Sequence, residues 1–367
     1  MKKSTSLSKL ALQKFRKNFW GVFSFGFLTL CVLLAIFAYA LAPDNSRNAN
    51  QMHLSIHSKN PGFSVEMLSI PAAVEDQNAF SVFFFGKKNV DTEVPISSFT
   101  TKESIIKITE YTADATDGLE KEYALSLFPK ANAVSEIPQH YIAKKTFLLG
   151  TDKYGRDLLS RMLIGIRISL GIGFVAVFIS LVIGVTLGAI AGYYGGKVDA
   201  AIMWLINVTW SIPTLLLVIA ITLALGKGFW QVFIAVGLTM WVEVARVVRG
   251  QVMGVKQMQY VTAARALGFK DFRIIVKHIL PNSMAPVIII SAANFASAIL
   301  IESGLSFLGI GAQPPMPSLG GIIKDHYAYI ILGKPYLALI PGLAIMSLVT
   351  AFMLIGNALR DAMDVRG

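Results

Sequence analysis

The sequence is poor in cysteine and in charge. Among 367 residues there is one cysteine, Cys31, so no disulfide can form within the chain. Charged residues make up only 15% of the sequence and hydrophobic residues make up 54%. The mean hydropathy is +0.60. These values are typical of a membrane protein and not of a soluble one.

Several catalytic and ligand-binding signatures are also missing. No GxxxxGK[ST] pattern is present, so the chain has no phosphate-binding loop of its own. We find no HExxH, CxxC or exposed nucleophile signature. His53 and His57 have the spacing of two metal ligands on a helix, but nothing around them predicts a helix, which favours two solvated histidines. We expect no catalytic residue, cofactor or metal in this chain.

Basic residues outnumber acidic ones, 33 to 22, which gives a formal net charge of +11. Such an excess could indicate nucleic-acid binding. No DNA-binding or RNA-binding motif is present, however, and a membrane protein concentrates Lys and Arg in its cytoplasmic loops. We therefore expect lipid contacts and no nucleic-acid partner.

The first apolar run, residues 20–41, is long enough to cross a bilayer core of about 30 Å. Basic residues before it predict that segment 1–19 is cytoplasmic. The alternative is a cleavable signal peptide, since Ala38-Tyr39-Ala40 imitates a cleavage site, but signal-peptide cores are shorter. The basic residues are Lys2, Lys3, Lys9, Lys14, Arg16 and Lys17.

Residues 44–145 are polar and contain no segment that could span a membrane. Short apolar runs at 80–85 and 105–108, rich in aromatic and β-branched residues, predict strands. About a hundred residues can form a small domain with its own core. We expect an extracytoplasmic α+β or β-rich insertion, with a partly disordered loop as the alternative.

The remaining chain, 148–362, holds the membrane core. Five further spans are predicted, which makes six transmembrane helices in an otherwise all-α membrane protein with both termini cytoplasmic. Gly184 and Gly188 form a small-xxx-small pair that suits close helix packing, and Pro213 should kink its span. The predicted spans are Ile168–Ala191, Ala201–Leu225, Trp230–Val247, Ala285–Leu308 and Leu337–Leu359.

Charge agrees with this topology. The loop between Arg246 and Lys277 carries seven basic residues, and an inside N-terminus places it in the cytoplasm together with Lys197, Arg360 and Arg366. Within the spans, Glu302 should face a cavity or a partner, because an unpaired carboxylate is costly there. For Glu243, pairing with the nearby Arg246 and Arg249 is the default expectation.

Residues 260–282, YVTAARALGFKDFRIIVKHILPN, interrupt the membrane segments. Small residues such as Ala263 and Ala264 would let another surface approach a short helix that Gly268 ends. A second amphipathic helix should follow and stop at Pro281. The alternative is an interfacial helix of some unrelated membrane protein.

This stretch resembles the EAA loop of bacterial ATP-binding cassette (ABC) importer permeases, in which a coupling helix docks on the ATPase subunit. Thr262 stands where the motif has glutamate, so the carboxylate that a salt bridge to the ATPase would use is missing. The resemblance implies an ATPase-coupling helix at 260–268. The residues assigned to coupling are Tyr260, Thr262, Ala263, Ala264, Arg265, Leu267, Gly268, Leu280 and Pro281.

Two further segments resemble dipeptide, oligopeptide and nickel permeases. One is LGTDKYGRD, in which Gly150 and Gly155 should form turns and Asp157 should cap a helix that begins at Leu158. The other is ESGLSFLGIGAQPP, which contains Glu302. The candidate pathway or interface residues are Gly150, Thr151, Asp152, Gly155, Arg156, Asp157, Pro213 and Glu302.

The resemblance implies a permease subunit of a peptide importer in the bacterial cytoplasmic membrane. Its implied partners are a homologous permease, two ATPase subunits that hold ATP and Mg, and an extracytoplasmic solute-binding protein. Nickel or another small solute remains an alternative substrate. A secondary transporter or channel, and a membrane enzyme, are the alternatives from other classes.

Overall fold

The computed structural model describes residues 7–72, 77–102, 104–112, 118–226 and 228–363. Lys2, Lys3 and Arg366, which contribute to the expected topology, lie outside these ranges. The chain divides into two compact units. One comprises residues 1–32, 169–313 and 343–367, and the other comprises residues 33–168 and 314–342.

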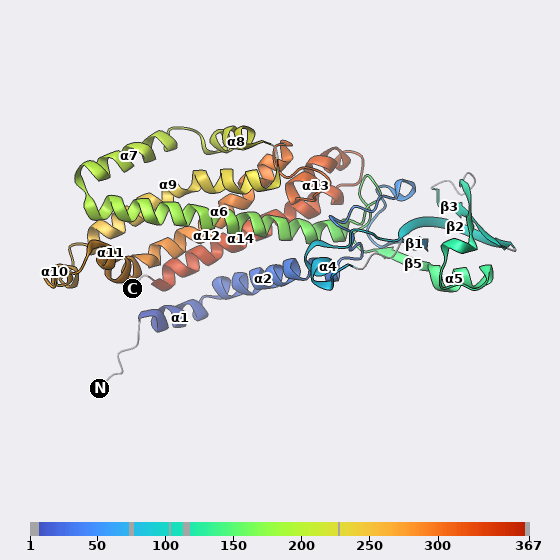
Figure 1. Cartoon of the computed structure of the whole chain (residues 1–367), viewed down its shortest axis with the longest axis horizontal. Helices are drawn as coiled ribbons and strands as arrows, with labels where there is room; N and C mark the ends of the chain where they lie inside the picture. The colour runs from blue at the N-terminus through green and yellow to red at the C-terminus, as the bar shows by residue number, and fades with distance from the viewer. Residues whose placement is uncertain (1–6, 73–76, 103, 113–117, 227, 364–367) are drawn as a thin grey trace. The chain divides into compact units, whose positions relative to one another are not determined.

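The first unit is helical (Figure 1). Five described helical segments are long and apolar enough to cross a membrane, and a sixth span results if one bent pair is counted. Short α10 and α11 lie between α9 and α12 in the sequence, and α2, α6 and α14 also have residues in the second unit. The helices are α1 (Leu7–Lys17), α2 (Phe19–Ile36), α6 (Leu158–Tyr194), α7 (Gly196–Trp210), α8 (Thr214–Leu225), α9 (Phe229–Val255), α10 (Gln259–Ala266), α11 (Asp271–Ile274), η4 (Ile275–Ile279), α12 (Leu280–Phe307) and α14 (Tyr336–Met363).

The predicted span over residues 201–225, with its expected kink at Pro213, is a pair of separate helices in the structure. Two helices, α7 and α8, meet at a 91° bend in place of the expected kink. Pro213 precedes the first residue of α8 with φ −54° and ψ 125°, an extended conformation that cannot continue α7. Proline also lacks an N–H for a helical hydrogen bond, and it disfavours the helical conformation at Ile212 before it. The helix is therefore interrupted at Ile212 and Pro213.

The prediction that Pro281 ends a helix was also wrong. Helix α11 passes through the π-helical turn η4 into α12, and residues 271–307 form one apolar segment. Pro281 is the second residue of α12, directly after the π-helical turn. A π turn adds one residue to the helical repeat, which gives the proline ring room beside the preceding turn.

Helices α6 and α9 approach each other through glycine. A Cβ at Gly184 would lie 2.6 Å from Val244 Cβ, and one at Gly188 would lie 2.5 Å from the Ala245 carbonyl oxygen. Gly192, one turn further on, is equally close to Arg249. The predicted small-residue contact is therefore confirmed, and it extends over three successive turns of α6.

The second unit contains a five-stranded antiparallel sheet in the order β4-β3-β2-β1-β5. Its core includes Leu68, Ile96 and Ile106 on the strands and Phe128 and Ile137 beside them. The strands are β1 (Phe63–Ile70), β2 (Thr92–Lys102), β3 (Ile105–Glu110), β4 (Glu120–Ala124) and β5 (Ile142–Phe147).

The strand prediction for residues 105–108 is confirmed by β3, but the one for residues 80–85 was wrong. Those residues form α4 (Ala79–Phe85). The Asn78 side chain accepts a hydrogen bond from Phe80 N at 3.0 Å, and this cap favours the helix over the strand that the aromatic composition predicts. The same unit holds α3 (Ala38–Leu41), η1 (Leu54–Ile56), η2 (Leu125–Leu127), η3 (Val134–Glu136), α5 (Ile137–Tyr141), α13 (Leu319–His326) and η5 (Tyr327–Ile330).

Candidate functional site

The expected coupling segment forms α10, and Gly268 closes it. Gly268 has φ +74°, the left-handed conformation that glycine adopts most readily. Its N–H donates to the Arg265 carbonyl at 3.0 Å, and Phe269 N donates to the Ala264 carbonyl at 3.2 Å. No atom lies within 4 Å of a Cβ built at Gly268, so the requirement for glycine is conformational and not steric.

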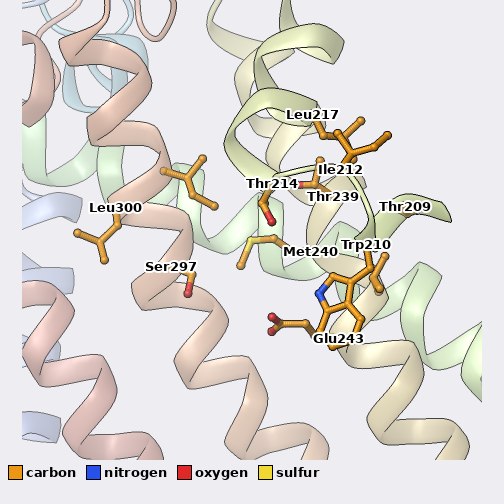
Figure 2. A pocket seen from close by; sticks show the side chains of 12 residues that line it. Thr209, Trp210, Ile212, Thr214, Leu217, Thr239, Met240, Glu243, Ser297 and Leu300 are labelled. Carbon is orange, nitrogen blue, oxygen red and sulfur yellow. The ribbon is translucent and has the colours of Figure 1, made fainter. Parts of the chain in front are cut away.

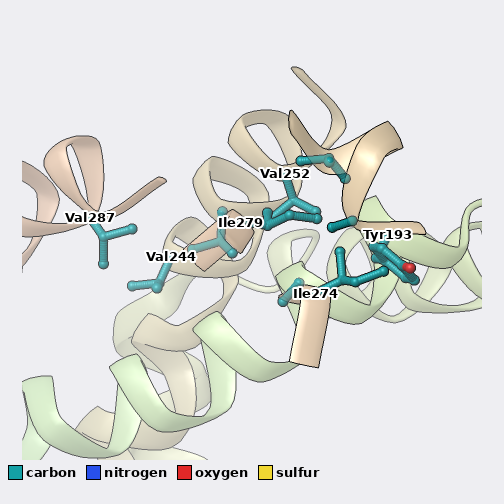
Figure 3. Packing of buried hydrophobic residues seen from close by; sticks show 10 residues of the cluster. Tyr193, Val244, Val252, Ile274, Ile279 and Val287 are labelled. Atoms are coloured by element: carbon teal, nitrogen blue, oxygen red, sulfur yellow. The ribbon is translucent and has the colours of Figure 1, made fainter. Parts of the chain in front are cut away.

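Helix α10 has one buried and one exposed face. Val261 and Ala264 are 1% and 4% exposed, and they belong to a cluster with Val252, Ile274 and Ile279 (Figure 3). This cluster also includes residues of α6 and α12. The expectation that Ala264 faces a partner was therefore wrong, because a residue three positions after Val261 shares its inward face.

The opposite face of α10 is free of this packing. Tyr260, Ala263 and Leu267, which share one helical face by their spacing, are exposed, with Leu267 at 74%. Met258 and Phe272 beside the helix in the sequence are 53% and 77% exposed. We name the surface of Tyr260, Ala263 and Leu267 the α10 outer face. Thr262 is exposed as well, whereas Leu280 and Pro281 lie at the start of α12.

Tyr193 at the end of α6 connects α6 with the segments around α10. Its hydroxyl donates to Asp271 Oδ1 at 2.5 Å. The Arg265 guanidinium lies 3.5 Å from that hydroxyl and 5.7 Å from the ring, and Lys256 Nζ lies 5.4 Å from the ring centroid. Arg265 is exposed, and its hydrogen bond with Tyr193 raises its pKa. The sequence analysis missed Tyr193 because nothing local distinguishes it.

The LGTDKYGRD segment is fastened to residues 53–60 within the second unit. Gly150 and Gly155 have φ +77° and +74° as expected. A Cβ at either position would collide with the carbonyl oxygen of Lys59 or of His53. Thr151 Oγ1 donates to the Ile56 carbonyl at 2.5 Å and accepts from Lys59 N at 2.8 Å. The two glycines and the threonine thus have a packing role.

Asp152 is the centre of a buried charge network. Its Oδ2 accepts from Arg156 Nε at 2.6 Å and lies 3.6 Å from Arg161 Nε. Its Oδ1 accepts from the backbone N–H groups of Tyr154 and Arg156 at 2.8 and 3.0 Å. Arg156 also donates to Asn50 Oδ1 at 3.0 Å. One buried carboxylate therefore holds two guanidinium groups and the turn before α6.

Asp157 caps α6, as predicted. Its Oδ2 accepts from Ser160 N at 2.7 Å and from Ser160 Oγ at 2.5 Å. Burial raises the pKa of Asp157, and the hydrogen bonds from Ser160 partly oppose that shift. Since the charged and polar residues of this segment bind their own chain, a role in the pathway or an interface stays a prediction.

Glu302 is fully buried within α12. Its Oε1 accepts from Ser306 Oγ at 2.7 Å, and its Oε2 accepts from Ser169 Oγ at 3.3 Å. Ser306 Oγ in turn accepts from Ala312 N at 3.2 Å. The carboxylate therefore orients a serine that holds the turn after α12, which supports a structural role for Glu302.

A pocket of about 270 Å³ opens beside the break between α7 and α8 (Figure 2). Its walls include Trp210 from α7, Met240 and Glu243 from α9 and Ser297 from α12. Glu243 is the only charged residue among the 12 that line it, all of which the structure describes. Sequence reasoning missed this pocket, although Pro213 and a glutamate within a predicted span, Glu243, were both visible signals.

The expected pairing of Glu243 with the arginines of α9 was wrong. Arg249 pairs with Asp199 of α7, with N–O distances of 2.5 and 2.6 Å. Arg246 lies over the Trp210 ring at 3.7 Å and donates to Asn207 Oδ1 at 3.4 Å. Both guanidinium groups are therefore held by α7.

The two histidines in the second unit differ. His57 is exposed, but His53 is 7% exposed and lies 3.7 Å from Glu93 Oε2, so the expectation of two solvated histidines was wrong for His53. Burial lowers the pKa of His53. Within the described part of the chain, no group of three or more metal-ligating His, Cys, Asp or Glu side chains occurs.

Two family models match the sequence. The model of the binding-protein-dependent transport system inner membrane component matches residues 184–365. The model of the N-terminal transmembrane domain of oligopeptide transport permease C matches residues 6–60. Neither match includes residues 61–183.

Curated relatives are similar over about 60% of the chain. A glutathione transport system permease from Pectobacterium atrosepticum is 41% identical over 59% of this chain and 71% of its own length. A dipeptide permease from Alkalihalophilus pseudofirmus is 42% identical over 59% and 70%. An oligopeptide permease from Bacillus subtilis is 37% identical over 60% and 72%.

Among solved structures, a chain of the MetNI methionine ABC transporter in an inward-facing conformation gives a TM-score of 0.45 at 18% identity. That match covers 55% of this chain and 95% of the other.

Proposed function

This chain belongs to the family of binding-protein-dependent transport system inner membrane components, and we propose that it imports peptides as the permease subunit of an ABC importer. The relatives are named for dipeptide, oligopeptide and glutathione transport, and all three solutes are peptides. The family supplies transport and not catalysis, so ATP hydrolysis belongs to separate subunits.

The proposal that α10 couples the permease to an ATPase rests on the exposure of the α10 outer face. Its exposed apolar residues are Tyr260 and Ala263 on α10 and Leu267 at the C-cap, and the other face of this short helix packs against its own chain. Exposed apolar groups gathered on one face favour a protein partner. We assign that face to an ATPase subunit, with a second ATPase docking on a homologous permease.

The packing around α10 offers a route for coupling. Val261 and Ala264 share a buried cluster with Val252 of α9 and Val287 of α12. Helices α9 and α12 also line the pocket at the α7–α8 break. A close-packed interior resists local deformation. An ATPase that displaces α10 should therefore move the ends of α9 and α12 that pack against α10, and move them together.

We further propose that both termini and α10 lie in the cytoplasm and that residues 44–145 lie outside it, facing a solute-binding protein. The excess of Lys and Arg between residues 246 and 277 supports this orientation. Reporter fusions at Lys88 and Arg273 should report opposite sides of the membrane. The same side for both would refute the topology.

The transport proposal is tested by reconstitution. The chain, its partner permease, the two ATPases and the binding protein are placed in proteoliposomes. We expect uptake of radiolabelled dipeptide or oligopeptide that requires ATP. Nickel uptake without peptide uptake would make the substrate proposal wrong, and uptake without ATPase subunits would favour a secondary transporter.

A further inference from the structure

The pocket at the α7–α8 break contains a carboxylate with no described counter-ion. Glu243 lies within the candidate membrane span Trp230–Val255, three residues before the basic cluster that begins at Arg246. A charge within a membrane span is costly unless it faces a cavity or a partner. Among the described residues, no ion pair to Glu243 is present, and its side chain lines the pocket (Figure 2).

The two nearest arginines along α9, Arg246 and Arg249, bind residues of α7 and do not neutralise the Glu243 carboxylate. Arg246, three residues further along α9, is held against the Trp210 ring and Asn207. Arg249, two turns along, is held by both carboxylate oxygens of Asp199. Both guanidinium groups therefore contact α7, and the Glu243 carboxylate can interact with a ligand in the pocket.

Two of the other polar side chains in the wall, Thr209 and Thr239, also favour a ligand that donates hydrogen bonds. Thr209 Oγ1 donates its hydrogen to the Leu205 carbonyl at 2.9 Å, and Thr239 Oγ1 donates to the Val236 carbonyl at 2.8 Å. Because both hydroxyl hydrogens are already donated, these two side chains can only accept hydrogen bonds from a ligand in the pocket. Two hydroxyl acceptors and a carboxylate match a group with several N–H donors and a positive charge.

We propose that this pocket binds the ammonium group of the transported peptide, with Glu243 as the counter-ion and the Thr209 and Thr239 hydroxyls as further acceptors. The inference rests on the proposed function, because it supplies the ligand. A volume of about 270 Å³ accommodates a dipeptide or one end of a longer peptide, with Trp210, Met240 and Leu300 beside its apolar atoms. Helix α9, which carries Thr239 and Glu243, precedes α10 in the chain, and α12, which carries Ser297, shares the buried cluster with α10.

The test measures equilibrium binding to the full complex in nanodiscs without the binding protein, whose own selectivity would otherwise dominate. The probes are radiolabelled Ala-Ala and N-acetyl-Ala-Ala, which differ in the ammonium charge. The variants are Glu243→Gln and Glu243→Asp. Glu120→Gln is the matched control, since Glu120 is exposed on the sheet of the other unit.

The wild-type complex should bind Ala-Ala about tenfold or more tightly than the acetylated probe, as expected for a charge-assisted hydrogen bond. Glu243→Gln should bring that ratio close to one, Glu243→Asp should retain a preference, and Glu120→Gln should leave the ratio unchanged. An unchanged ratio in Glu243→Gln, or equal binding of both probes by the wild type, would overturn the proposal.

Co-purification separates a structural role from the proposed one. Loss of the partner permease from the Glu243→Gln complex would make Glu243 an ion-pair partner between subunits and would overturn the ligand site. Retention of the partner together with the changed ratio supports it. Failure of the wild-type complex to import any peptide with ATP and binding protein would instead refute peptide import itself.

Discussion

Alanine at Gly188 should weaken the contact between α6 and α9. Its Cβ would lie 2.5 Å from the Ala245 carbonyl oxygen and 2.8 Å from Val248 Cβ. Ordinary contacts between such atoms are near 3.5 Å, so the helices would have to separate by about 1 Å. Gly184 and Gly192 make the same close approach, so the contact would loosen along three turns.

Overpacking of this kind costs about 1–3 kcal/mol, against a helix-propensity gain of at most about 1 kcal/mol for Gly→Ala. With about 2–4 °C per kcal/mol for domains of 150–250 residues, we expect Gly188→Ala to lower the Tm by several degrees. Cys31 is the single cysteine and is 5% exposed, so a thiol-reactive dye reports unfolding of the purified chain.

Gly250→Ala on α9 is the matched control, because no atom lies within 4 Å of its Cβ position. This substitution should leave the Tm unchanged or raise it slightly. If both variants melted at the wild-type temperature, α6 and α9 would not be in backbone contact, and the packing argument would be wrong.

Three further substitutions test other parts of the molecule. Asp152→Asn should destabilise the chain by about 3–5 kcal/mol because it leaves two buried guanidinium groups without their carboxylate, whereas Asp325→Asn should cost under about 1 kcal/mol in the same thermal assay. Tyr193→Phe should preserve complex assembly and reduce peptide-stimulated ATP hydrolysis, which a phosphate-release assay measures. Stability should fall as the pH drops from 7.5 to 5. Burial lowers the pKa of His326, and its neutral ring accepts a hydrogen bond from Lys153 N at 3.2 Å. The stabilisation from the neutral ring is therefore fully present above the ordinary pKa of 6.5, and it is lost as the pH falls through the lowered pKa of the folded state. His326→Gln should reduce that pH dependence, and an identical pH profile in the variant would contradict the assignment.

Local signals in the sequence were enough for part of this structure. Gly268 was predicted to end a short helix, Asp157 to cap α6, and Gly184 to permit close packing, because each depends on backbone chemistry within a few residues. The apolar runs likewise predicted membrane-length helices. Their number remains five or six, because α7 and α8 form a bent pair.

Other features depend on contacts between distant residues. Glu243 stands beside two arginines in the sequence, but α7 supplies Asp199, Trp210 and Asn207, and these hold the arginines away from it. The inward direction of Ala264 depends on a cluster drawn from α6, α9, α10 and α12. Pro281 begins a helix in place of ending one because a π turn precedes it, and composition does not reveal such a turn.

The most direct test of the account is co-purification of the ATPase subunits with a Leu267→Asp variant. Leu267 is 74% exposed on the α10 outer face, so a charge there should leave the chain folded and remove an apolar docking contact. Leu119→Asp is the control, since Leu119 is 67% exposed beside β4. We expect the Leu267→Asp variant to lose most of the co-purified ATPase and the Leu119→Asp variant to retain it. Full retention by Leu267→Asp, with peptide uptake at the wild-type rate, would contradict the assignment of α10 as the coupling helix.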